Sequence, residues 1–171
     1  MSEEVKWLIA REIPRLRRYA FSLVHDAESA DDLVQDCLER AIRKRHLWYR
    51  QGSIRGWLFR ILYNVFLNQR RRRAKDRQNV ELDEMTLTGD DTAEQERQAA
   101  CTDIMGAMEE LPDEQRAAIV LTAVEGLSYD EAAEVLGVPI GTLRSRLSRG
   151  RERLRDRYVP HPSSIPLRRV K

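Results

Sequence analysis

The sequence predicts an all-α protein of two small helical domains joined by a flexible acidic linker. Apolar residues recur at helical spacing through most of the 171 residues, and strand-like alternation is nearly absent. From Asp76 to Arg97 this periodicity fades, and eight acids stand against two bases. We therefore expect a first domain over residues 1–75, a linker over 76–102, a second domain over 103–158 and a loose tail over 159–171.

Charge is sorted along the chain although the net charge is only +2. Six of the eight residues from Arg70 to Arg77 are basic, and basic residues dominate again from Arg144 to Arg157. Two basic blocks around an acidic connector indicate two anionic contacts, most simply with nucleic acid.

The first domain is predicted to hold three helical stretches. One opens near Val5, and Pro14 is expected to kink or restart it. The next has Ser29 as its predicted N-cap. A longer helix begins at about Ile54 and carries an apolar side on which Trp57 is interpreted as a core residue.

The second domain has the pattern of a helix-turn-helix. Leu111-Pro112 fits a helix start, and Gly126 closes that helix. A short helix over Ser128–Leu136 ends at Gly137, and a last helix runs to about Tyr158. Side chains suited to bases and phosphates form the outward face of the last helix, with Arg146 at its margin; they are Arg144, Ser145, Ser148 and Arg149. The alternative is a solvated, salt-bridged face, but acids are nearly missing between Pro139 and Arg151.

An acidic strip lies on the helix that contains Val34 and Cys37, opposite its apolar side. Its members are Asp32, Gln35, Asp36 and Glu39. Carboxylates repel DNA phosphates, so the strip is either an ordinary solvated surface or a contact for another protein.

Several other functions lack support in the sequence. The three histidines have no ligand or triad spacing, and no phosphate-binding loop or nucleophile motif occurs, so an enzyme, a metal site and a cofactor are not expected. Cys37 and Cys101 are expected to be reduced thiols in the cytoplasm. No segment has the length and apolarity for membrane insertion.

The motifs together resemble the extracytoplasmic-function sigma factors of bacterial RNA polymerase. The stretches Leu111–Arg116, Glu125–Tyr129 and Gly141–Leu147 are similar to sigma region 4, which binds the −35 promoter element through its last helix. Asp31–Asp36 resembles region 2.2, and Trp57–Asn64 resembles region 2.4. About residues 8–72 and 105–157 take part in the resemblance.

The resemblance implies three sets of contact residues. The acidic strip would dock on the clamp helices of the polymerase β′ subunit. The −35 contacts would be Thr142, Arg144, Ser145, Arg146, Ser148 and Arg149. The −10 contacts would be Tyr49, Arg50, Gln51, Gly52, Ser53, Arg60, Asn64, Asn68 and Arg71. The resemblance also implies binding to the β flap and control by an anti-sigma factor. A freestanding helix-turn-helix regulator with an N-terminal partner-binding domain remains the alternative.

Overall fold

The computed structural model describes residues 3–44, 48, 53–77 and 106–158, with the side chains of 76, 77 and 158 excepted. Residues 78–102 of the expected linker, the tail and residues 49–52 of the expected −10 set lie outside this range. All regular structure within the described range is helical, which confirms the predicted all-α class. None of the described helices is both long enough and apolar enough to span a membrane.

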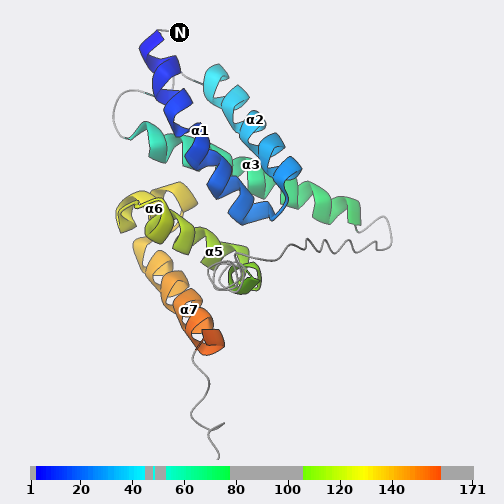
Figure 1. Cartoon of the computed structure of the whole chain (residues 1–171), viewed down its shortest axis with the longest axis vertical. Helices are drawn as coiled ribbons and strands as arrows, with labels where there is room; N and C mark the ends of the chain where they lie inside the picture. Colours follow the sequence, from blue (N-terminus) through cyan, green and yellow to red (C-terminus); the bar gives the residue numbers. More distant parts are fainter. Residues whose placement is uncertain (1–2, 45–47, 49–52, 78–105, 159–171) are drawn as a thin grey trace, which may run out of the picture.

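Three helices form the first unit: α1 (Glu3–Val24), α2 (Ala27–Arg43) and α3 (Ile54–Arg77). They lie together in Figure 1, with α3 crossing behind the other two. Their shared core is fully buried, and the ring of Tyr19 meets that of Phe59 edge-on at 5.3 Å. Cys37 is a free, buried thiol, and burial raises its pKa to about 12.

Two helix boundaries in this unit differ from the sequence interpretation. Pro14 lies inside a continuous α1. Ile9 and Leu16, on either side of it, are both buried in the same core, so packing holds both parts of the helix. The N-cap of α2 is Asp26 rather than Ser29, because the Asp26 carboxylate accepts the Ser29 backbone N–H at 2.8 Å.

The second unit contains α5 (Asp113–Ile119), a π-helical turn η2 (Val120–Val124), α6 (Tyr129–Leu136) and α7 (Ile140–Tyr158). At the end of η2 the Glu125 N–H donates to the Val120 carbonyl at 2.9 Å, which is the i→i−5 bond of a π turn. A capping box joins Ser128 and Glu131 at the start of α6. Gly137 ends α6 with φ of 65°, a conformation that glycine adopts without strain.

The corner of the helix-turn-helix is therefore confirmed where the sequence placed it. Leu143 and Leu147 of α7 are buried on the side opposite the exposed arginines. Gly150 has a packing role that the sequence analysis missed. A Cβ atom there would lie 2.7 Å from the Ile119 Cδ1 atom, so the absence of a side chain lets α7 approach α5 closely.

The two units pack against each other. Helix α3 contacts α6, and α1 contacts α5 and η2, so the buried apolar residues form one continuous cluster across both units. Arg116 of α5 is 3% exposed, and its Nη2 atom donates to the Leu23 carbonyl of α1 at 3.3 Å. The separate domains expected from the sequence thus share a packed interface.

Candidate nucleic-acid and partner interfaces

Helix α7 presents a polar face away from the core. Arg144, Ser148 and Arg149 are exposed on it. Ser145 is half-buried, and its hydroxyl donates to the carbonyl of the half-buried Thr142 at 3.0 Å. Because Leu143 and Leu147 fix the opposite side in the core, these residues are held outward on a rigid helix. This is the arrangement that a recognition helix needs to reach into a major groove.

Arg146 differs from its neighbours. Only 17% of its side chain is exposed, and its guanidinium lies 3.0 Å from the Glu114 carboxylate of α5. In this structure it therefore links α7 to α5 within the second unit, while the other arginines of the predicted −35 set remain open to solvent.

Next to this face lies a hollow of about 320 Å³, whose residues the sequence analysis did not single out as a set. It is lined by Tyr129, Arg144, Leu147, Ser148, Arg151 and Arg155. Both terminal nitrogens of Arg151 lie 3.5 Å from the Tyr129 hydroxyl, which holds the guanidinium beside the start of α6. Positions 144, 148, 151 and 155 recur at helical spacing, so this signal was present in the sequence.

The polar side of α3 carries the described part of the predicted −10 set. Ser53 is exposed just before the helix, and its carbonyl accepts the Trp57 N–H at 3.1 Å. Four further residues of the set are exposed along α3: Arg60, Asn64, Asn68 and Arg71. The Arg60 guanidinium lies 3.4 Å from the Glu134 carboxylate of α6.

Trp57 packs against the core but is only partly buried, in line with its interpretation as a core residue. Its ring centroid is 6.3 Å from that of Trp48, at 30° between the ring planes. In the sequence, Trp48 directly precedes the segment 49–52 that the resemblance assigns to base capture.

The acidic strip of α2 is present as predicted. Asp32, Gln35 and Glu39 are exposed, and the Gln35 amide donates to the Glu39 carboxylate at 3.5 Å. Asp36 is half-buried and accepts the side-chain amide of Gln69 in α3 at 3.2 Å. That bond fixes the orientation of the Asp36 carboxylate, so the strip is braced by the neighbouring helix.

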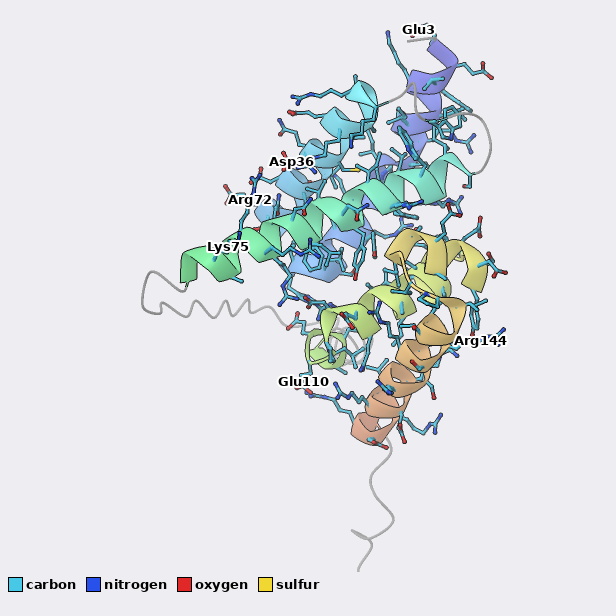
Figure 2. The ribbon with its side chains drawn as sticks, turned by 180° about the vertical axis from the view of Figure 1, so that it is seen from behind. Glu3, Asp36, Arg72, Lys75, Glu110 and Arg144 are labelled. Atoms are coloured by element: carbon cyan, nitrogen blue, oxygen red, sulfur yellow. The ribbon has the colours of Figure 1, made fainter. Side chains whose placement is uncertain are left out.

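The acidic strip lies on the same side of the molecule as the basic end of α3, whereas the arginines of α7 lie elsewhere. Figure 2 shows Asp36 on α2 and Arg72 and Lys75 on the last turns of α3 on one side of the view, and Arg144 on the opposite side. Arg72 and Lys75 are exposed. Among the described residues, α3 and α7 thus expose basic side chains and α2 exposes an acidic strip.

Comparisons with known proteins agree with this geometry. Residues 9–63 match the family described as the Sigma2 domain of PhyR, and residues 101–154 match Sigma-70, region 4. A relative from Mycolicibacterium smegmatis, "ECF RNA polymerase sigma factor SigE", is 36% identical over 91% of this chain, and the alignment spans 62% of that relative's length. Another, "ECF RNA polymerase sigma factor EcfG" of Rhodopseudomonas palustris, is 33% identical over 85% of this chain and 80% of its own length.

A solved structure with the same arrangement is that of the sigma factor RpoE in complex with the anti-sigma factor NepR from Bartonella quintana. It matches with a TM-score of 0.77 and 33% identity, over 91% of this chain and 97% of that one. The match extends over both units, as does the sequence similarity to the relatives. The chain therefore belongs to the extracytoplasmic-function sigma factors of the sigma-70 family.

Proposed function

We propose that this chain directs core RNA polymerase to specific promoters in the cytoplasm, acting by binding alone. Residues 1–75 would serve as region 2 and residues 103–158 as region 4, connected through 76–102. The acidic strip of α2 would dock on the β′ clamp helices, α3 would contact the −10 element, and α7 would read the −35 element. The observation that supports this division is that α2 exposes an acidic strip, whereas α3 and α7 expose arginines.

Energetics explain why such a chain needs the polymerase. Extracting a base from the stack costs a few kcal/mol. Stacking on aromatic or arginine side chains returns about 1–3 kcal/mol per base. The difference is too small for strand opening by the isolated chain, so contacts made by core polymerase must contribute the rest.

Run-off transcription with purified core polymerase tests this function. Promoter-dependent transcripts are expected only when the chain is added, and core alone serves as the control. A freestanding helix-turn-helix regulator would instead occupy duplex sites unaided and would leave core without promoter preference. Tight duplex binding by the chain without any association with core would therefore contradict the proposal.

We also propose that an anti-sigma factor controls the chain. Two structural neighbours support this. The Bartonella quintana protein is bound to NepR, and CnrH, 28% identical with a TM-score of 0.63, is bound to the cytosolic domain of CnrY. The partner would cover the acidic strip of α2 and outer faces of the second unit, and so would compete with core polymerase for the same residues.

Arg151→Ala is expected to weaken binding to −35 duplexes by about 1 kcal/mol for every sequence tested. The hollow beside Tyr129 suits a backbone phosphate, and phosphate contacts carry no base preference. The slope of log affinity against log salt concentration should fall in size by about 1. Fluorescence anisotropy with the full chain at several salt concentrations measures both quantities.

Arg153→Ala is the matched control for this variant. Arg153 is exposed on α7, and because it lies two residues after Arg151 its side chain faces away from the hollow. The Arg153→Ala variant removes the same charge and is expected to change the affinity for DNA much less. Equal losses in the two variants would mean that only the overall charge of α7 matters.

A further inference from the structure

Helix α1 carries a strip of aromatic and basic side chains that the proposed function does not use. Trp7 is 58% exposed, and the guanidinium carbon of Arg11 lies 4.7 Å from the centroid of its ring. Arg11 is exposed and Arg15 is half-buried. Because positions 7, 11 and 15 follow one another every four residues, they lie along one side of the helix. We call Trp7, Arg11 and Arg15 the α1 strip.

The chemistry of the strip suits nucleic-acid bases. A single exposed tryptophan needs no functional explanation, because isolated apolar side chains are common on protein surfaces. Here, however, a guanidinium lies within cation–π distance of the indole ring. Aromatic rings and guanidinium planes are the two kinds of side chain on which unpaired bases stack. The strip therefore offers both kinds within one turn of a helix.

The surroundings of the strip are basic. Over residues 5–24, helix α1 contains five basic residues and one acid, Glu12. The Glu12 side chain is only 15% exposed, and it is shared by the guanidiniums of Arg15 at 3.6 Å and Arg55 at 3.2 Å. Two cations thus neutralise this one carboxylate, and the helix keeps a net positive charge that attracts phosphates.

The contact with Arg55 also connects the strip to the proposed −10 interface. Arg55 lies in the first turn of α3, two residues after Ser53, which is one of the proposed −10 contacts. Its Nε atom donates to the Glu12 carboxylate, so the start of α3 is held against the middle of α1. The helix rises about 12 Å between Trp7 and Arg15. At the phosphate spacing of about 3.4 Å along one strand, that length accommodates about three nucleotides.

The direction in which unpaired DNA leaves the −10 element follows from the proposed function. The −35 element is read as a duplex, so the DNA between the two elements stays paired. Opening therefore extends from the −10 element toward the transcription start, and the unpaired strand continues on that side. In Figure 1 the first turns of α1 lie at the end of the molecule opposite α7, the helix proposed to hold the duplex.

We propose that the α1 strip binds the unpaired DNA strand where it leaves the −10 element toward the transcription start. Trp7 stacks on a base, and Arg11 and Arg15 bind the adjoining phosphates. The contact is independent of sequence, because stacking and phosphate contacts both tolerate any base. This inference rests on the proposed function, since it requires α3 to bind the −10 element.

Two single-stranded oligonucleotides test the inference, with the chain assembled on saturating core polymerase. Both contain the −10 element, and one carries four additional thymidines on the side of the transcription start. Fluorescence anisotropy measures the two dissociation constants, and their ratio is the gain from the extension. Contacts that core polymerase itself makes with the extension contribute equally in every variant, so the gains of the variants can be compared directly.

Trp7→Ala is expected to reduce the gain about tenfold, because it removes a stacking platform. Its affinity for the unextended oligonucleotide should not change. Trp7→Phe keeps an aromatic ring and should retain most of the gain. Trp7 is largely exposed, so its replacement removes no core packing.

Arg11→Ala is expected to reduce the gain about fivefold, through the loss of one phosphate contact. Lys6→Ala is its matched control. Lys6 is an exposed cation of the same helix, but it lies on a different side from Arg11 and pairs with Glu3 at 2.7 Å. Removing its charge should leave the gain unchanged. Equal losses in Arg11→Ala and Lys6→Ala would mean that the overall charge of α1, and not the strip, attracts the strand.

The outcomes separate this inference from the proposed function. An unchanged gain in Trp7→Ala would overturn the inference and leave the proposed function intact. Weaker association of Trp7→Ala with core polymerase, without a change in the gain, would overturn it too, because α1 would then contact a protein. If the unmutated chain on core binds the unextended oligonucleotide no better than core alone does, the proposed function itself is wrong.

Discussion

Arg116→Met is expected to lower the free energy of unfolding by about 3–5 kcal/mol, because the substitution leaves buried acceptors without a donor. The side chain is 4% exposed, and its guanidinium holds the Asp113 carboxylate at 2.6 Å. It also donates to four backbone carbonyls, those of Leu23, Met108, Glu109 and Leu111. Chemical denaturation followed by circular dichroism measures the change.

Arg153→Met is the control for this variant, since Arg153 is an exposed residue of α7. Its effect should stay within about 0.5 kcal/mol. The Leu23 carbonyl belongs to α1, so the loss of Arg116 should also weaken the contact between the two units. Both units should therefore lose stability in this variant. A loss below 1 kcal/mol would mean that water replaces the guanidinium at these carbonyls.

Asp36→Lys is expected to reduce the affinity for core polymerase about 100-fold, or about 2.7 kcal/mol. The variant reverses the charge at the centre of the acidic strip and removes the bond from Gln69 that orients the carboxylate. A clamp surface that accepts carboxylates would then face a cation. Titration of labelled chain with purified core polymerase measures the dissociation constant.

Binding to −35 duplexes should be unchanged in Asp36→Lys, because α7 is remote from α2 (Figure 2). Asp130→Lys on α6 makes the same change in net charge and should retain full affinity for core. If both variants lose affinity equally, long-range attraction rather than docking through α2 accounts for the binding. Unaltered affinity in Asp36→Lys would remove α2 from the proposed interface.

Local patterns in the sequence predicted most of the fold. Apolar spacing and turn residues located α5, α6 and α7 of the second unit, and Gly126 and Gly137 marked two helix ends correctly. The helical residues 106–109 were not predicted. The errors arose where two local signals competed. Asp26 and Ser29 are both good N-caps, and the structure uses Asp26, which directly follows His25 with its left-handed backbone at φ of 57°. Pro14 broke no helix, because tertiary packing on both sides outweighed the missing donor.

The candidate site was predictable only where it depends on one helix. The acidic strip of α2 and the outer face of α7 follow from periodicity alone. Partners across the units do not: nothing in the spacing of α3 indicates that Arg60 meets Glu134, 74 positions away. The role of Arg146 was hidden for the same reason, since Glu114 lies on another helix. The contact residues themselves remain predictions for DNA and polymerase.

The π turn η2 sets the phase of the residues that follow it. A π turn accommodates one residue more than an α-helical turn, and each residue advances a helix by about 100°. With the wide turn in place, Val124 is 58% exposed while the Glu125 carboxylate is turned inward toward Arg18. Regular α-helical winding of the same residues would instead rotate that carboxylate by about 100°, away from its cation. The wide turn thereby determines whether the two halves of the molecule recognise each other.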